Sequence, residues 1–289
     1  MASTQILKSR IRSVKSTRQI TKAMQLVAAS KMRRSQEATK ASAPYTLAAR
    51  QLLTDLSKHA SVKDNPLFVE RAVKGRLLIV VASDKGLAGA YNSNIFKLYA
   101  EQLKEDQKAG AKTKTITIGR KASQFVSRLK SVDVIGSYED LPDHPGGREL
   151  RAILDSARDM FISGQVDAVD VLYTDFVSSL VQDAKAIRVL PAGFEPAKNL
   201  GATSDAVYEP SHEEVLDGIA YRLIGAQIFQ ALLDARASEH NMRMLAMKNA
   251  TDNASDLIDD LTLEMNKARQ SAITQELAEI SGGVEALNE

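Results

Sequence analysis

The feature that most constrains this fold is a seven-residue repeat of apolar side chains in the C-terminal third of the chain. Steps of three and four residues, taken alternately from Leu216, reach Ala272, and fourteen of the seventeen positions on this path are apolar. No proline follows Pro210, so nothing in the composition breaks a helix there. A sustained repeat of seven makes paired helices wind into a left-handed supercoil. The sequence therefore predicts one helix over residues 211–281, on the order of 105 Å long.

The N-terminal 60 residues also predict helix, because residues 6–39 contain neither glycine nor proline. Their apolar positions are less regular than those of the C-terminal repeat: Leu7, Ile11, Val14, Ile20, Met24 and Val27. Pro44 is expected to interrupt and kink this helix, since proline lacks the backbone N–H of a helix interior. Helix is expected to resume over residues 45–59, with Ala48, Leu52 and Leu56 on one face.

The charge of the chain is divided between its ends. Residues 1–40 hold ten Lys or Arg and one acid, giving +9, whereas residues 251–289 hold nine acids and two bases, giving −7. This opposition favours an arrangement in which the two ends lie side by side as antiparallel helices. The competing interpretation, a basic arm for nucleic acid, is weaker because no aromatic residue is interleaved with the bases before Tyr45.

The middle of the chain alternates between strand and helix signals. Apolar or β-branched runs predict strands at 76–83, 114–119, 132–138, 166–176 and 184–190, and amphipathic segments predict helices at 94–108, 120–130 and 147–162. Alternation of this kind is typical of a parallel, Rossmann-like α/β sheet. The short link 177–183 predicts that the last two strands form a hairpin with an antiparallel edge strand.

These signals predict three regions and one fold class. The regions are an N-terminal coiled-coil helix at 1–60, a Rossmann-like α/β domain at 75–195 and a C-terminal coiled-coil helix at 210–289. The fold is thus α/β, with a long antiparallel left-handed coiled coil of the terminal helices and the α/β domain inserted between them. Because the C-terminal helix is the longer one, its tip is expected to project beyond its partner.

The loop Ser83–Asn92 follows the first strand and precedes a helix, which is where phosphate loops occur. Its glycines, Gly86 and Gly89, match neither common nucleotide-binding spacing. We therefore prefer a tight strand-to-helix turn with Asn92 as the helix cap. A partner-contact surface is the intermediate alternative, because Lys85 is expected at an exposed position of the turn.

Several kinds of site are unsupported by the composition. The chain has no cysteine, and its four histidines are far apart, so neither a metal site nor a cofactor is expected. His240 falls on the heptad path and is expected to be a packed polar residue. No apolar run approaches the roughly 20 residues that cross a bilayer, and the first residues lack the apolar core of a signal peptide. Any membrane association is expected to go through a partner.

Three segments resemble the gamma subunit of F-type ATP synthases. They are IRSVKSTRQITKAMQLVAASKMR at 11–33, MKNATDNA at 247–254 and NKARQSAITQELAEI at 266–280, and the loop SDKGLAG at 83–89 fits the same family. The resemblance spans the whole chain. It departs from the family pattern at Val284, where an alanine usually follows the glycine, and it lacks the cysteine-bearing insertion of the chloroplast form. The start of the chain resembles that of bacterial members.

The resemblance implies a central-stalk rotor that turns inside a ring of alpha and beta subunits, without a catalytic site of its own. Rotation of an ion-driven ring of c subunits would be transmitted to the catalytic beta subunits, coupling ion flow to ATP synthesis. The partners implied are the alpha, beta and epsilon subunits and the c ring, with no nucleic acid. The implied location is the cytoplasmic face of the bacterial inner membrane, where the chain is peripheral.

The same resemblance implies which side chains contact partners. Arg269 and Gln270 match the family's pair that contacts a beta subunit, and a guanidinium can bind a carboxylate at two points. The remaining implied contacts are Lys22, Met24, Lys85, Thr274 and Glu276. For Arg269 the bland alternative is a solvated helix face. Two other functions stay open at this point: a nucleotide-dependent α/β enzyme and a coiled-coil adaptor with no rotary role.

Overall fold

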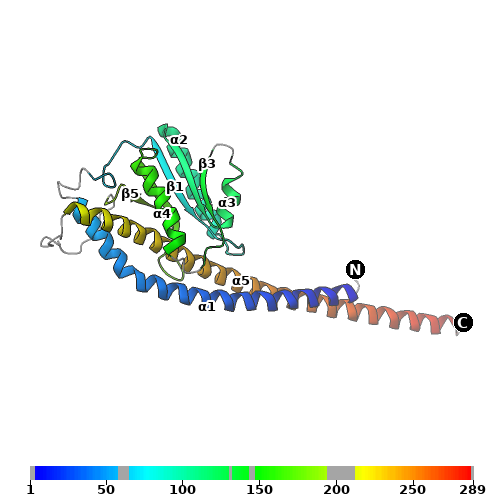
Figure 1. Cartoon of the computed structure of the whole chain (residues 1–289). Helices are drawn as coiled ribbons and strands as arrows, with labels where there is room; N and C mark the ends of the chain where they lie inside the picture. The colour runs from blue at the N-terminus through cyan, green and yellow to red at the C-terminus, as the bar shows by residue number, and fades with distance from the viewer. Residues whose placement is uncertain (1–3, 58–64, 130–131, 143–146, 194–211, 288–289) are drawn as a thin grey trace. The chain divides into compact units, whose positions relative to one another are not determined.

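The fold was analysed in a computed structural model that describes residues 4–57, 65–129, 132–142, 147–193 and 212–287. Two long helices, α1 (Thr4–Ser57) and α5 (His212–Leu287), flank a five-stranded sheet in the chain (Figure 1). Contacts divide the protein into two units. The coiled-coil unit comprises residues 1–28 and 243–289, and the α/β unit comprises residues 29–242.

The helix α5 confirms the prediction of a single long helix, whereas α1 corrects one. Pro44 lies inside α1, which continues through it to Ser57 instead of stopping and resuming. Proline removes one backbone hydrogen bond of the helix, but burial of the residues that follow Pro44 offsets this cost. Ala49 and Leu53 are buried in the core of the α/β unit, and the Thr46 hydroxyl donates to the carbonyl of Ser42 (3.3 Å).

The sheet has the strand order β3-β2-β1-β4-β5. The strands are β1 (Gly75–Val81), β2 (Lys112–Ile118), β3 (Asp133–Tyr138), β4 (Ala168–Phe176) and β5 (Gln182–Leu190). The first four run parallel, and β5 pairs antiparallel with β4. This confirms both the parallel α/β sheet and the terminal hairpin that the short link at 177–183 predicted.

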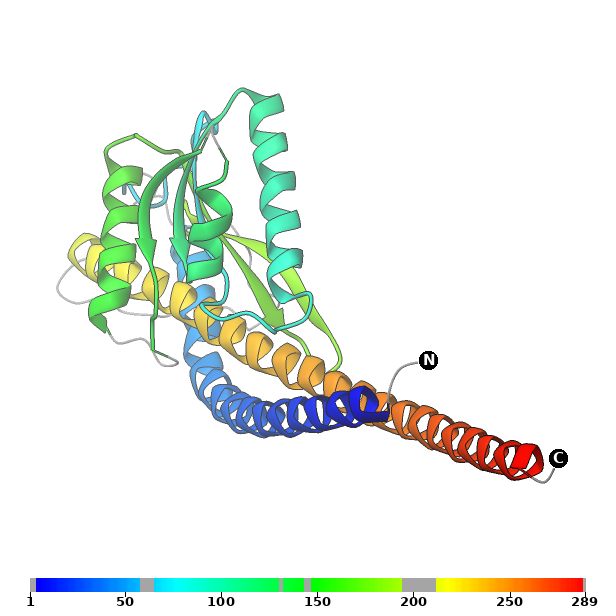
Figure 2. The ribbon, with the colours of Figure 1, turned by 90° about the vertical axis from the view of Figure 1, so that its right-hand side faces the viewer.

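Helices cover both faces of the sheet (Figure 2). Alternate residues of β1 point to opposite sides, so Leu78 and Val80 pack with α2 (Tyr91–Ala109) and α3 (Arg120–Val126). On the other face, Leu77 and Ile79 pack with α4 (Gly147–Ile162), with α5 and with the last turns of α1. This second layer is the larger core, and it contains the segment of α5 from Ala220 to Ala235.

In the coiled-coil unit the two helices pack as an antiparallel pair. Leu7 and Ile11 of α1 cluster with Ile258 and Leu261 of α5, and further along the pair Thr251 donates to the hydroxyl of Thr21 (2.8 Å). Low residue numbers of α1 lie beside high residue numbers of α5, and the numbers of α1 rise as those of α5 fall. The two helices are therefore antiparallel. The predicted heptad seam is confirmed here, since all its members from Met247 to Ala268 are buried or half-buried.

Candidate functional site

The carboxyl end of β1 is a position at which α/β proteins commonly bind ligands. From β1 the chain goes to its neighbour β2, whereas β4, the neighbour on the other side, is reached only after β3, so the strand order reverses at β1. Ligands of open α/β sheets bind outside such a switch point. The loop Ser83–Ala90 follows β1 here and leads directly into α2.

The loop after β1 is held by its own polar groups. The helix α2 begins at Tyr91, and its N-cap is Ala90 without a side-chain hydrogen bond, so the prediction that Asn92 caps this helix is wrong. Asn92 instead accepts from the backbone N–H of Ser83 (3.1 Å) and donates to its hydroxyl (2.8 Å). The Ser83 hydroxyl also bonds the carbonyl of Lys85 (2.7 Å). The side-chain amide of Asn92 therefore closes the loop instead of capping the helix.

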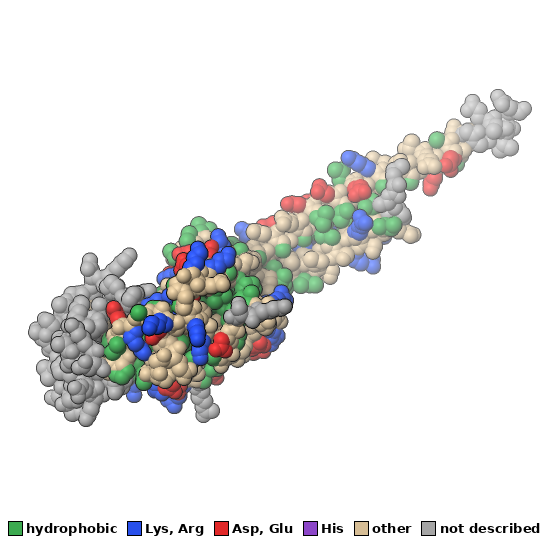
Figure 3. Space-filling model, turned by 90° about the horizontal axis from the view of Figure 1, so that it is seen from above, with side chains coloured by type: hydrophobic (Ala, Val, Ile, Leu, Met, Phe, Trp, Pro, Cys, Tyr) green, Lys and Arg blue, Asp and Glu red, His purple; other side chains and the backbone are tan. Residues whose placement is uncertain are grey.

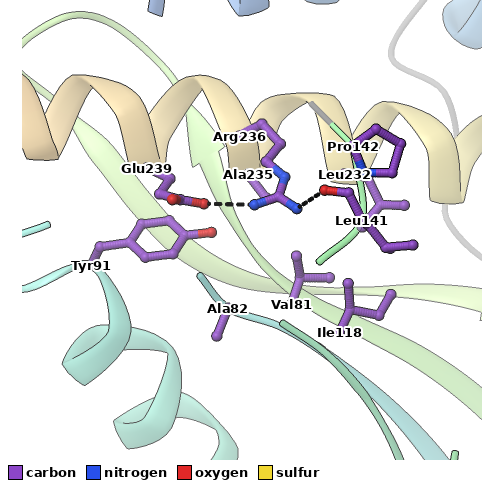
Figure 4. A pocket seen from close by; sticks show the side chains of 10 residues that line it. All are labelled: Val81, Ala82, Tyr91, Ile118, Leu141, Pro142, Leu232, Ala235, Arg236 and Glu239. Atoms are coloured by element: carbon purple, nitrogen blue, oxygen red, sulfur yellow. Dashed lines mark hydrogen bonds and ion pairs between the residues drawn. The ribbon is translucent and has the colours of Figure 1, made fainter. Parts of the chain in front are cut away.

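The space beside the carboxyl ends of β1 and β2 is filled by α5. Arg236 enters it from the helix, and the remaining cavity, about 10 Å³, is the size of one water molecule (Figure 4). The cavity is lined by Val81, Ala82, Tyr91, Ile118, Leu141, Pro142, Leu232, Ala235, Arg236 and Glu239. A nucleotide does not fit in this volume. This cavity at the end of β1 therefore does not support the alternative of a nucleotide-dependent enzyme.

The tip of α5 forms the second candidate surface. Every residue from Arg269 to Ser281 is exposed, which confirms that the longer helix ends beyond the cover of its partner (Figures 1 and 2). Ile273, Leu277 and Ile280 follow one another at helical spacing and are 49%, 62% and 65% exposed. An apolar stripe of this kind is typical of a protein-binding surface.

The predicted contact residues of the tip lie on this bare segment. Arg269 and Gln270 are exposed neighbours, and the hydroxyl of Thr274 bonds the Gln270 carbonyl one turn back (2.9 Å). Glu276 is also exposed. The structure thus brings these four residues together within two turns of one helix, although their contacts with partners stay a prediction.

The other predicted contact residues are distributed over both units. Lys22 is exposed on α1, where it bonds the Gln25 side chain (3.3 Å), and Met24 is half-buried. Lys22 lines a shallow groove of about 530 Å³ together with Arg18, Gln19, Ala23, Leu26, Thr251 and Ser255. Lys85 is exposed in the α/β unit, as predicted for the turn, and therefore belongs to a different surface.

Charge is segregated within the coiled-coil unit. Lys8, Lys15 and Lys22 are exposed on α1, and the acids of α5 from Asp252 to Glu279 are exposed as well. Among the described side chains, no ion pair joins the bases of residues 4–28 to these acids. The two ends do lie side by side as expected, but the apolar seam joins them. Figure 3 shows the acidic side chains of this pair grouped mainly along one border.

Sequence reasoning missed the α1 half of the seam. Steps of three and four from Leu7 reach Ala28, and every position on this path is buried or half-buried: Leu7, Ile11, Val14, Arg18, Thr21, Gln25 and Ala28. Three of these side chains are polar or charged, so an apolar repeat does not reveal them. Ile20 and Val27, two of the less regular apolar positions, lie off this path and are each 58% exposed.

These features define a class of protein: a two-helix stalk with a bare helical tip, continuous with an α/β domain whose sheet is covered at its carboxyl edge by the protein's own long helix. Comparison with known proteins is consistent with this class. A family model described as ATP synthase matches residues 3–287. The ATP synthase gamma chain of Legionella pneumophila strain Corby is 39% identical over 99% of this chain and 100% of its own length. That of Stenotrophomonas maltophilia strain K279a is 41% identical over the same shares. The chain belongs to the family of ATP synthase gamma chains.

Solved structures show the same fold. A chain of the Euglena gracilis mitochondrial ATP synthase, in an assembly of OSCP, F1 and c-ring, has a TM-score of 0.70 at 16% identity. The match covers 98% of this chain and 94% of that chain. A chain of the Tetrahymena thermophila central stalk and c-ring has a TM-score of 0.62 at 24% identity and covers 80% and 99%. Of the helices that the structure describes, none has an apolar stretch suited to spanning a bilayer.

Proposed function

We propose that this chain is the rotor of an ATP synthase, which transmits rotation of an ion-driven membrane ring to catalytic beta subunits and so couples ion flow to ATP synthesis. The observation that carries the proposal is the bare tip of α5 in a chain related over its full length to ATP synthase gamma chains. Such a tip needs a surrounding partner to cover Ile273, Leu277 and Ile280.

The geometry of the helix pair suits a rotor. A shaft that places identical subunits in different states must present different surfaces around its axis. The coiled-coil unit does so, because the exposed charges of α1 in this unit are all bases, whereas the exposed acids lie on α5. Up to Ala268 both helices present side chains to the surroundings, and from Arg269, among the described residues, only α5 does. The exposed surface therefore also changes along the axis.

The partners in this proposal are the alpha and beta subunits around the coiled-coil unit, with the epsilon subunit and the c ring at the other end of the stalk. The chain would be peripheral to the cytoplasmic face of a bacterial inner membrane and would reach it only through these partners. It would contribute no catalytic site. The ring of alpha and beta subunits would be contacted by Lys22, Met24 and Lys85 and by the tip residues Arg269, Gln270, Thr274 and Glu276.

Replacement of Arg269 by alanine tests this function. A hydrogen bond between charged groups contributes about 1.5–3 kcal/mol, so losing it should lower coupled ATP synthesis by about tenfold to a hundredfold. The exposed Arg269 supports no described packing, so circular dichroism of the free chain should not change. The measurement is ATP synthesis by vesicles that carry the reassembled complex.

Lys267→Ala is the matched control, because it removes another exposed cation from the same turn. It should leave synthesis near the unsubstituted level. The rotor proposal itself has a separate test, in which the unsubstituted chain is added to a complex that lacks its gamma chain. Failure to co-purify with alpha and beta subunits, or to restore synthesis, would refute it.

A further inference from the structure

Arg236 is a buried cation that joins α5 to the edge of the sheet. Its side chain is 12% exposed. One terminal nitrogen, Nη2, donates to the carbonyl of Leu141 (2.9 Å) and lies 3.3 Å from Oδ2 of Asp84. The other, Nη1, pairs with Glu239 one turn along the same helix (3.0 Å, Figure 4). The guanidinium therefore contacts α5, the loop after β1 and the segment after β3 together.

Asp84 is the group that collects these segments. Its Oδ1 accepts the backbone N–H of Arg120 at the start of α3 and that of Asp140 after β3, both at 3.0 Å. Its Oδ2 faces Arg236. One carboxylate thus ties together the chain after β1, β2 and β3, and one guanidinium attaches this assembly to α5.

Electrostatics keep both groups charged. Burial alone would raise the pKa of Asp84, but two backbone N–H groups and Arg236 outweigh it and lower the pKa. Burial alone would also lower the pKa of Arg236, and Glu239, Tyr91 and Asp84 reverse this. Both groups are therefore charged at neutral pH.

The ion pairs of Arg236 fix the positions of the joined segments more than they stabilise the fold. Buried ion pairs lose in desolvation much of what they gain by attraction, yet removing one partner leaves an uncompensated charge. Their distinctive contribution is a fixed arrangement of the elements that they join. A planar guanidinium with several donors in one fork serves this purpose better than the single point charge of lysine.

We propose that Arg236 is a positioning residue, a clamp that fixes the carboxyl edge of the sheet to α5 so that load applied to the α/β unit passes into the helix. The clamp lies at the carboxyl edge of the sheet, which is the edge at which open α/β proteins bind ligands, and here a side chain of the protein's own helix occupies that space. This proposal rests on the rotor function for its meaning, since only a loaded stalk needs such a joint.

Three substitutions isolate the clamp. Arg236→Met keeps the aliphatic stem and removes the fork. Asp84→Asn keeps an oxygen for the two backbone N–H groups and removes the charge opposite Arg236. Arg120→Met is the matched control, because Arg120 also pairs with acids of this edge, Glu139 and Asp140, but does not reach α5.

Hydrogen exchange of the full-length chain is the first measurement. Losing hydrogen bonds to charged groups should speed exchange in residues 83–90 and 139–142 by about tenfold to a hundredfold in Arg236→Met. Asp84→Asn should do the same, and the double variant should be little worse than either alone. Arg120→Met should leave exchange in 83–90 unchanged. Unaltered exchange in Arg236→Met would overturn the proposal.

Coupling in the assembled complex is the second measurement, since a purely structural contact would not change it. The number of ions pumped per ATP hydrolysed should fall against an opposing gradient in Arg236→Met and Asp84→Asn. Faster exchange with unchanged coupling would reduce Arg236 to a structural contact and overturn the proposal. If Arg236→Met does not fold, Arg236→Lys and Asp84→Asn decide by the same criteria. Failure of the unsubstituted chain to restore coupling refutes the rotor function instead.

Discussion

Gly119 stands where β2 comes close to the end of β1. Its φ is +93°, and a Cβ at this position would overlap the carbonyl oxygen of Ala82. The backbone conformation is one that side-chain-bearing residues rarely adopt. The oxygen belongs to the backbone directly after β1, where the N–H of Ala82 is held by the carbonyl of Ile118 (2.9 Å), so it cannot move away easily. The glycine therefore allows α3 to start directly after β2, which positions the Arg120 N–H on Asp84.

Replacing Gly119 with alanine should lower the free energy of unfolding by at least about 3 kcal/mol, because strain and overlap add. Gly110→Ala is the control: its φ is +72°, but nothing lies within 4 Å of an added Cβ. Strain alone should cost it about 1–2 kcal/mol. Urea unfolding of the full chain measures both. Equal costs for the two variants would show that the approach to Ala82 is not tight.

Asp234 is a buried carboxyl whose ionisation should make stability depend on pH. Burial, followed by the charge of Asp175, raises its pKa to about 6, although Gln230 and Lys185 act in the opposite direction. In the unfolded chain the pKa is about 3.9, so the folded state binds the proton more tightly. The stabilisation this gives is complete below about pH 4 and is lost as pH rises through 6.

Asp234→Asn should therefore stabilise the protein at pH 8 by about 2–3 kcal/mol and leave it unchanged near pH 4. The amide oxygen can still accept the bond that Gln230 donates (3.1 Å). Thermal unfolding at several pH values measures this difference. Asp252→Asn, at an exposed site of the same helix, serves as the control. A gain that is the same at both pH values would contradict the assignment.

Single buried contacts are the part of the site that the sequence could not reveal. Arg236 and Asp84 are 152 residues apart, and nothing in local patterning links them. The sequence predicts the loop around Asp84 but gives Asn92 the wrong role, because an amide can cap a helix or close a loop equally well. Only the three-dimensional position of Ser83 decides between these alternatives.

At the level of elements, the sequence predicts helices and strands well wherever their apolar side chains follow a single repeat. The helix α4 runs from Gly147 to Ile162 as predicted, and the strands begin and end within a few residues of their apolar runs. The seam of α5 was predictable because its contacts are apolar. That of α1 was not, since Arg18, Thr21 and Gln25 occupy it. In the α/β unit α5 is buried on most sides from Ala231 to Asn241, which a single seam does not predict.

The α1–α5 pairing can be tested at its outer end. Leu7 is 1% exposed and packs with Ile258 and Leu261, so Leu7→Ala should destabilise the local pairing by about 2–4 kcal/mol. Amide exchange in residues 4–20 should become faster by at least tenfold, while residues 75–81 of β1 keep their protection. Ile6→Ala is the adjacent control, since Ile6 is 50% exposed. The same change in both variants would argue against the seam.

At the scale of the whole molecule, the chain passes between its two units only inside helices. The boundaries fall between Ala28 and Ala29 in α1 and between Met242 and Arg243 in α5. Both units therefore share continuous hydrogen-bonded backbone instead of a flexible linker. For a rotor this means that load crossing between the units is carried by helix, and that the rigidity of the helix near the boundary sets how much load is lost.

Glycine near this boundary should lower coupling without unfolding either unit. Lys248 and Asn249 are exposed, so replacing both with glycine removes no buried contact. Glycine costs a helix about 1 kcal/mol relative to alanine, and two together should make local opening about thirtyfold more frequent. In the assembled complex, ion pumping against an opposing gradient should then fall more than ATP hydrolysis does. The pair Lys248→Ala and Asn249→Ala loses the same side chains and keeps the helix, so it should pump normally. If the glycine and alanine pairs pump alike, continuity of α5 is not what carries the load, and the transmission would have to run through the surrounding subunits.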